Sequence, residues 1–144
     1  MLQIIAAAVL AAAGTAWAQG SPVGLWKTID DDGKTEKSLI RITESGGVLT
    51  GKLEKLLDPT AKPDAVCDKC SDERKDQPVL GMVILRNARQ DTDEKDTWTG
   101  GEILDPNNGK TYKVRLTPTD GGHKLEVRGF IGPFYRTQVW IRVE

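Results

Sequence analysis

The last third of the chain, from Gly100-Gly101-Glu102-Ile103-Leu104-Asp105-Pro106 to Thr137-Gln138-Val139-Trp140-Ile141-Arg142, carries the densest structural information in the sequence. It predicts four consecutive strands, at about residues 97–104, 110–117, 124–131 and 134–143, joined by three tight turns. Asn108-Gly109 predicts a type I′ hairpin turn, because both residue types accept a positive φ. Residues 118–122 predict the second turn, and Gly132-Pro133 predicts the third.

The preceding part of the chain adds four more predicted strands. Three are at residues 24–29, 38–43 and 48–57; a helix competes for residues 52–57, but Gly51 and the flanking turns favour a strand. Residues 79–85 form a continuous apolar run, which predicts a strand buried on both faces. Residues 86–96 are polar and are expected to form an excursion with room for one helical turn.

About eight strands with short links, and no long helix, predict an all-β antiparallel meander. Small meanders commonly close into a barrel, because closure removes both unpaired edges. An up-and-down barrel of eight strands encloses packed side chains or one small ligand. A flattened sandwich is the alternative architecture.

The chain has 144 residues, of which 38% are hydrophobic and 28% are charged. This length and composition predict one folded domain with a real core. The formal net charge of −1 gives no electrostatic reason to expect a nucleic-acid partner.

Residues 1–18 differ in composition from the rest of the chain. They are almost entirely apolar and end in Ala16-Trp17-Ala18, a small-x-small pattern that predicts a signal peptide cleaved before Gln19. A membrane anchor or a buried helix is the alternative, but the apolar run is short for a membrane span. We therefore expect a single domain over residues 19–144, periplasmic or secreted, with no membrane span after cleavage.

Three blocks of residues resemble a known bacterial family. They are Gly24-x-Trp26, then Gly100-Gly101-x-Ile103-x-Asp105-Pro106-x-x-Gly109-x-x-Tyr112, and Leu125-x-Val127-Arg128-Gly129-Phe130-Ile131-Gly132 with Arg136-Thr137-Gln138-x-Trp140-x-Arg142. Together they resemble the exported family catalogued as domain of unknown function 2147. The resemblance implies a lipocalin-like or calycin-like barrel, and it supplies no catalytic residues.

Gly24-x-Trp26 also resembles the first-strand signature of lipocalins. In that group the tryptophan packs across the closed end of the barrel against an arginine of the last strand. Arg142 is the matching candidate and Arg136 the alternate. A guanidinium on an indole face contributes about 0.5–2 kcal/mol, so this pair is expected to seal the barrel.

Cys67 and Cys70 lie in the irregular segment at residues 58–78. In an oxidising compartment such a pair predicts a local disulfide. A redox-active pair would be expected at the N-terminus of a helix, which is not predicted here. A zinc site would need four ligands, whereas the chain offers two cysteines and one distant histidine, His123. We expect neither a metal nor a cofactor.

The sequence contains no catalytic motif, and we expect a protein that is not an enzyme. His123 follows Gly121-Gly122 and is expected in an exposed turn. Glu102 and Asp105 remain the candidates for carboxylate chemistry. Asp105 is more simply explained as a turn former whose oxygens accept backbone N–H groups.

The last strand has two chemically different faces. Tyr135, Thr137, Val139, Ile141 and Val143 share one face, which we favour as the buried one because it is mostly aliphatic or β-branched. In the competing hypothesis the other face points inward, and Arg128, Arg136, Gln138 and Trp140 bind an anionic or amphipathic ligand. That hypothesis requires Arg128 or Arg136 to be buried in a cavity.

The sequence is most consistent with an exported, non-enzymatic binding protein that holds a small hydrophobic or anionic ligand inside a β-barrel. The alternative is a structural or protein-interaction module of the cell envelope, acting through its surface and the Cys67–Cys70 loop. The sequence does not determine the oligomeric state.

Overall fold

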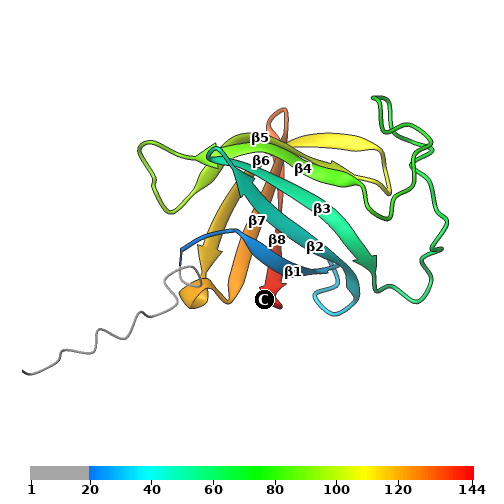
Figure 1. The fold of residues 1–144 in the computed structure, drawn as a ribbon, viewed down its shortest axis with the longest axis horizontal. Helices are drawn as coiled ribbons and strands as arrows, with labels where there is room; N and C mark the ends of the chain where they lie inside the picture. The colour runs from blue at the N-terminus through cyan, green and yellow to red at the C-terminus, as the bar shows by residue number, and fades with distance from the viewer. Residues whose placement is uncertain (1–19) are drawn as a thin grey trace, which may run out of the picture.

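The computed structural model describes residues 20–144, so the predicted signal peptide at residues 1–18 lies outside the described residues. The described residues form a closed, antiparallel barrel in which strands follow one another in chain order (Figure 1). The barrel confirms the prediction and excludes the sandwich. The strands are β1 (Gly24–Ile29), β2 (Glu36–Ser45), β3 (Val48–Leu56), β4 (Val83–Gln90), β5 (Trp98–Asp105), β6 (Lys110–Thr119), β7 (Lys124–Ile131) and β8 (Phe134–Arg142). A short 3₁₀ helix, η2 (Asp120–Gly122), connects β6 to β7.

The barrel interior is filled largely by alternate side chains of the strands, because successive residues of a strand point to opposite faces. In β4 the alternation is broken where the register with β3 shifts, so Ile84, Leu85 and Ala88 all belong to the core. The largest fully buried aliphatic and aromatic side chains are Trp26, Ile40, Ile42, Leu49, Leu85, Leu116 and Leu125. Across residues 20–144, no helix has the length and apolar character needed to cross a membrane.

The fourth strand differs from its prediction. It begins at Val83 and continues to Gln90, so residues 79–82 are not in the strand and residues 86–90 are not a polar excursion. Gly81 has a φ of 86° and its N–H donates to the Leu53 carbonyl oxygen at 2.7 Å, which makes a turn where an extended run was expected. The apolar run therefore supplies a turn followed by the start of a strand, and Leu80 in that turn is exposed.

The turn between β5 and β6 also differs in detail from its prediction. Only Gly109 has a positive φ, of 72°, so Asn108-Gly109 does not form a type I′ turn. The Gly109 N–H donates to the Asp105 carbonyl oxygen at 2.8 Å. The Asp105 carboxylate accepts the Asn107 N–H at 2.9 Å, which confirms Asp105 as a turn former. The third hairpin is as predicted, since Ile131 pairs with Phe134 around Gly132-Pro133.

The favoured choice of the buried face on β8 was wrong. Val139 and Ile141 are 44% and 37% exposed, whereas Trp140 is only 2% exposed. Trp140 pairs with the buried Leu125 of β7, and Gln138 pairs with the buried Val127. The face that carries Arg136, Gln138 and Trp140 therefore points into the barrel.

The barrel closes between β1 and β8 through a short seam. Trp26 pairs with Arg142 and Lys27 with Ile141, and backbone hydrogen bonds join Leu25 to Val143 and Glu144. The Arg142 guanidinium lies 4.2 Å from the centre of the Trp26 ring. Its three nitrogens donate to the carbonyl oxygens of Ser21, Val23 and Gly122 at 2.6, 2.8 and 2.6 Å. Burial lowers the pKa of Arg142, and these three acceptors compensate the buried charge.

The contact between β1 and the end of the chain also requires a residue without a side chain at position 24. Gly24 has a φ of 142°, and a Cβ added there would lie 2.5 Å from Nη1 of Arg142 and would also collide with the Glu144 carbonyl oxygen. The Gly24-x-Trp26 pattern thus combines a residue without a side chain with an indole that stacks on the guanidinium.

We expect Arg142→Lys to lower the free energy of unfolding by about 2 kcal/mol or more, because one ammonium cannot reach three separated carbonyls or stack as a planar group. Urea denaturation measures the change. Arg115→Lys is the control, since Arg115 is a partly exposed outer residue paired with Glu94, and it should change stability by less than about 0.5 kcal/mol. Equal stability of the two variants would contradict the assigned closure.

Candidate functional site

A cavity of about 390 Å³ lies at the end of the barrel opposite Arg142. It is bounded by the end of β1, the start of β2, the end of β3, the β5–β6 turn and the inward face of β7 and β8. Its inner wall is apolar and consists of Leu53, Leu56, Val79, Ile84, Ile103, Leu104, Val127 and Trp140. Cavities of this size and lining are typical of sites for small organic molecules.

Two polar pairs interrupt the apolar wall. The hydroxyls of Thr28 and Ser38 share a hydrogen bond of 2.7 Å and are both buried. The Trp140 indole N–H donates to the Gln138 side-chain oxygen at 3.3 Å, and the Gln138 amide nitrogen donates to Asp31 at 3.3 Å. These groups are satisfied by one another. The two hydroxyls and the Gln138 amide also offer capacity for a polar atom of a ligand, whereas the single N–H of Trp140 is already used.

The rim of the cavity carries four carboxylates and two cations. Lys37 donates to Asp58 at 2.8 Å, and this hydrogen bond lowers the pKa of Asp58 to about 2 and raises that of Lys37. Arg136 lies between two other aspartates, 3.4 Å from Asp31 and 3.5 Å from Asp105. Each rim cation therefore already has an anionic partner, and the cavity is not the partly cationic interior on which the competing hypothesis of an anionic ligand rested.

The structure brings three of the four predicted ligand-binding residues together. Trp140, Gln138 and Arg136 line the cavity. Arg128 belongs to the outward parity of β7, donates to the Thr137 hydroxyl and lies 4.7 Å from the Tyr135 ring centre, so it is outside the cavity. The arginines are not buried as the anionic-ligand hypothesis required, since the side chains of Arg136 and Arg128 are 51% and 33% exposed.

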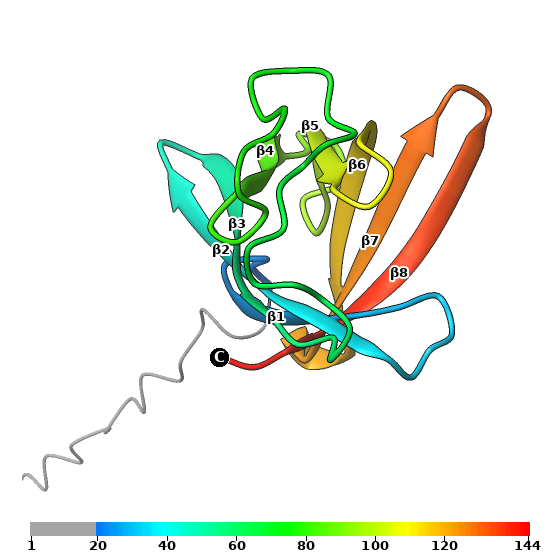
Figure 2. The same cartoon turned by 90° about the vertical axis from the view of Figure 1, so that its right-hand side faces the viewer.

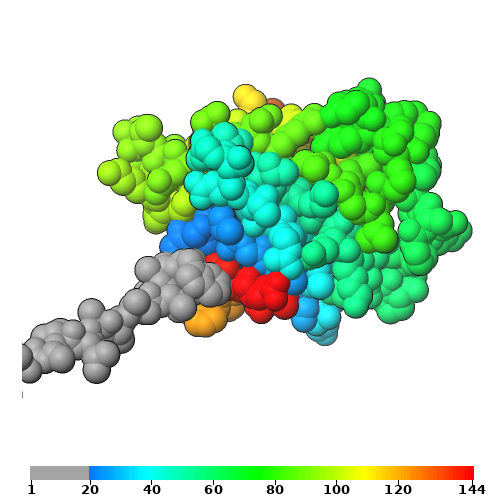
Figure 3. All heavy atoms as spheres, in the orientation of Figure 1, coloured from blue at the N-terminus to red at the C-terminus, as the bar shows by residue number. Residues whose placement is uncertain are grey.

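The β3–β4 connection, residues 57–82, covers much of the open end of the barrel. Figure 3 shows its atoms (green) packed over the right-hand end of the molecule. It carries Asp58, Thr60, Ala61 and Val79 to the cavity. Its far part is held by hydrogen bonds of the Cys67 N–H to Gln77 and the Val79 N–H to Ala65, both 2.9 Å long. The β3–β4 connection, called the cover below, is therefore held in a defined conformation although it has no long regular structure.

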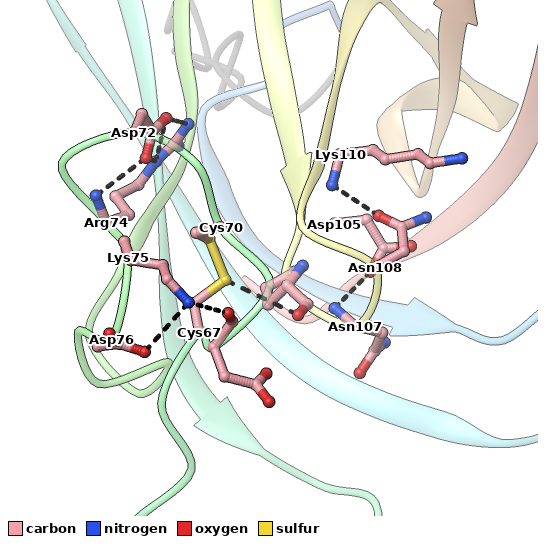
Figure 4. Close-up of a disulfide and its surroundings, with 12 residues drawn as sticks. Cys67, Cys70, Asp72, Arg74, Lys75, Asp76, Asp105, Asn107, Asn108 and Lys110 are labelled. Carbon is pink, nitrogen blue, oxygen red and sulfur yellow. Dashed lines mark hydrogen bonds and ion pairs between the residues drawn. A yellow bond between two sulfur atoms is a disulfide. The ribbon is translucent and has the colours of Figure 1, made fainter.

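The disulfide Cys67–Cys70 lies on the inner side of this cover (Figure 4). Both cysteines are buried and belong to the hydrophobic core, although the surrounding sequence is polar. Cys67 Sγ is 3.8 Å from the Pro106 carbonyl oxygen in the β5–β6 turn. The predicted disulfide is thus confirmed, and it packs the cover onto the turn that borders the cavity.

Gly109 allows this contact. A Cβ at Gly109 would lie 2.9 Å from the Cys70 nitrogen and would overlap the Lys69 carbonyl group. The backbones of the cover and of the β5–β6 turn therefore touch at a position where only glycine fits.

An ion-pair cluster attaches the cover to the outside of the sheet. Arg74 is 6% exposed, binds the Asp72 carboxylate and donates to the Val83 carbonyl oxygen at 3.0 Å. Arg86 on β4 joins Glu73 of the cover to Glu102 of β5. The hydrogen bonds from Arg74 lower the pKa of Asp72 to about 2.

The candidate catalytic groups are dispersed. Glu102 is engaged with Arg86 outside the cavity, and His123 is exposed beside η2 at the closed end. Asp105 lines the cavity, but its carboxylate holds the turn and Arg136. Within residues 20–144, no three His, Cys, Asp or Glu side chains form a group that could hold a metal ion.

Sequence reasoning missed Thr28, Ser38, Lys37, Asp58 and Asp31. Thr28 could have been found, because it shares the inward parity of Trp26 two residues before it. The Lys37–Asp58 pair depends on the register of the β2–β3 hairpin, in which Ser38 faces Leu56. Asp31 contacts β8 only because the barrel closes, and no local sequence pattern predicts that contact.

A closed, antiparallel barrel of eight strands in chain order is a lipocalin-like fold. The chain belongs to the family described as "Uncharacterized protein conserved in bacteria (DUF2147)", whose model matches residues 24–142. The fold is similar to that of protein HP1028 from the human pathogen Helicobacter pylori, described as belonging to the lipocalin family. That similarity has a TM-score of 0.70 at 18% identity, over 86% of this chain and 84% of the other. No curated protein matches the sequence.

Gly109→Ala is expected to loosen the cover. Gly33→Ala is a matched control, because Gly33 has a φ of 71° and nothing within 4 Å of a Cβ. Both variants should lose about 1–2 kcal/mol from the positive φ, and Gly109→Ala should lose about 1–3 kcal/mol more from the steric overlap. Urea denaturation gives the stabilities, and limited proteolysis should cut residues 58–78 faster in Gly109→Ala alone. Equal losses would contradict the close contact.

The acid dependence of stability should involve Asp72. Its pKa is about 2 in the folded protein against an ordinary value of 3.8, so its contribution is complete above about pH 4 and is lost as the pH falls towards 2. Arg74→Met should raise the Asp72 pKa towards 3.8 and flatten this part of the stability curve. Carboxyl NMR titration measures the pKa, with Lys75→Met as the control that leaves it unchanged. A wild-type Asp72 titrating near pH 4 would exclude the assigned pair.

Proposed function

We propose that the protein is an exported, non-enzymatic binding protein that holds a small, mainly hydrophobic molecule in the mouth of its barrel. The observation that carries the proposal is the cavity of about 390 Å³ with an apolar inner wall and a polar rim. Such a wall gains free energy by removing apolar ligand surface from water, at about 25 cal/mol per Å². The polar groups of the rim then orient the ligand.

The charges of the rim favour the hydrophobic ligand over the anionic one. The rim carries Asp30, Asp31, Asp58 and Asp105 against Lys37 and Arg136. A carboxylate ligand would have to compete with Asp31 and Asp105 for Arg136, at a site with an excess of negative charge. A neutral molecule, with a hydroxyl or amide able to reach Gln138 or Ser38, meets no such cost.

Export is supported by the signal-peptide pattern of residues 1–18 and by the Cys67–Cys70 disulfide, a bond typical of oxidising compartments. The absence of an enzymatic role is supported by the occupation of Glu102 and Asp105 in structural contacts and by the position of His123 at the sealed end. The periplasm of a Gram-negative bacterium is the proposed location.

The alternative, an envelope interaction module without a ligand, makes a different prediction for protein recovered from its own periplasm. Native mass spectrometry should detect a copurifying small molecule if the barrel is a carrier. A mass equal to that of the processed chain alone, together with failure to bind any apolar probe, would favour the interaction module.

A cavity-filling variant tests the site directly. Leu56 is half-buried at the cavity wall, and Leu56→Trp should weaken binding of the neutral fluorophore 1-aminoanthracene at least about tenfold, equivalent to about 1.4 kcal/mol. Fluorescence titration measures the affinity. Thr43→Trp, on the exposed outer face of β2, should bind within about twofold of the wild type. Undiminished binding by Leu56→Trp would place the probe elsewhere and refute the site.

A further inference from the structure

The distal half of β8 is an open strand edge. Among the described residues, β8 pairs with β7 along its whole length, from Phe134 to Ile141. On its other side it pairs with β1 only at Ile141 and Arg142. Figure 2 shows no strand on the outer side of the distal half of β8, whereas β7 stays paired with β6 from Lys124 to Phe130. Residues 135–139 therefore end the sheet.

The direction of the backbone groups along this edge follows from two hydrogen bonds at its base. The Val143 N–H donates to Leu25 on the β1 side at 2.8 Å, and the Arg142 N–H donates to His123 on the β7 side at 2.8 Å. Backbone groups of successive residues in an antiparallel strand point alternately to the two sides. The β7–β8 register has no shift between Ile141 and Phe134, so the same alternation holds along the whole strand. Tyr135, Thr137 and Val139 therefore present their N–H and C=O groups to the open side.

The side chains of the same three residues form an exposed, mainly apolar stripe on the outer surface. Tyr135 is 64% exposed and Val139 is 44% exposed, and Phe134 at the tip of the hairpin is 73% exposed. An edge with free backbone groups and apolar side chains is a ready template for another strand. Arg136 and Gln138, which could discourage pairing, point into the cavity instead.

We propose that the occupant is β8 of a second copy of this chain, in an antiparallel pair centred on Thr137. The sequence of the edge is complementary to itself about that residue. Thr137 faces Thr137 of the other copy, and Tyr135 faces Val139, which are the threonine pair and the aromatic–β-branched pair that stabilise antiparallel strands. Arg136 faces Gln138, so no two like charges are opposed.

This register satisfies the open backbone groups completely. Tyr135, Thr137 and Val139 of each copy both donate and accept a backbone hydrogen bond across the pair, because the N–H and C=O groups of all three point to the open edge. A register centred on Arg136 or Gln138 would set an identical polar side chain against itself. It would also pair only two of the three edge residues of each copy, because the third would face Pro133, which has no N–H, or Ile141, which already pairs with β1. The geometry thus selects Thr137 as the two-fold centre, and the inference does not depend on any ligand in the cavity.

Sedimentation velocity and light scattering of the purified protein, from low micromolar to near-millimolar concentration, test the dimer. We expect a reversible monomer–dimer equilibrium. Thr137→Lys should weaken it at least about tenfold, because the introduced ammonium groups face each other across the axis. Thr111→Lys adds the same charge at an exposed threonine of β6 and should leave the equilibrium unchanged.

A charge-swap mixture distinguishes loss of pairing from loss of folding. Thr137→Glu alone should also be monomeric, and an equimolar mixture of Thr137→Lys and Thr137→Glu should dimerise again. In the wild type, amide hydrogen exchange of Tyr135, Thr137 and Val139 should slow as dimer forms, whereas the amides of Arg136 and Gln138, which point to β7, should be protected throughout. Leu56→Trp should dimerise normally, which separates this test from that of the cavity.

Three results would overturn the proposal. The first is a wild-type protein that stays monomeric over the whole concentration range, which would leave the edge to a strand of another protein. The second is a dimer that both Thr137 variants retain. The third is a dimer in which the three edge amides exchange as fast as in the monomer.

Discussion

The stacking of the Arg142 guanidinium on Trp26 is the interaction on which the architecture depends. The seam between β1 and β8 is short, and the guanidinium reinforces it by binding carbonyls from the segment before β1 and from η2. A planar cation with donors in three directions suits this task, because it can stack on a ring and bridge separate chain segments at once. The seal at one end leaves the opposite end as the place where a cavity opens.

The open end of the barrel is held together by different contacts from those at the sealed end. There the strands diverge, and the long β3–β4 connection closes part of the opening without any regular element longer than a turn. Its conformation is maintained by covalent and close-packed contacts, namely the Cys67–Cys70 disulfide against Pro106 and the glycine contact at Gly109. A cover held from its inner side and by Arg74 at its outer side can keep a fixed shape although its sequence is mainly polar. The cavity therefore has a rigid border on that side.

The sequence predicted the number of strands and their order, because hairpin turns and alternation are local properties. The Trp26–Arg142 pair was suggested only by the resemblance to lipocalins. It misplaced the start of β4, because an apolar run does not reveal that Gly81 turns the chain. It also chose the wrong face of β8. Alternation separates two faces but does not say which is inward; the pairing of Trp140 with Leu125 decides that, and pairing is a property of two strands. The charged rim, including Lys37 with Asp58, depends on the same kind of long-range register.

The alternation of β8 also separates the two activities that we propose for it. Its even-numbered residues from Arg136 to Trp140 direct their side chains into the cavity and their backbone groups to β7. Its odd-numbered residues from Tyr135 to Val139 direct their side chains to the outer surface and their backbone groups to the open edge. Because the two sets share no side-chain position, a substitution in one can leave the other intact. One strand can therefore serve a ligand site and an interface between copies, and a second strand at the edge would stiffen the wall of the cavity from outside.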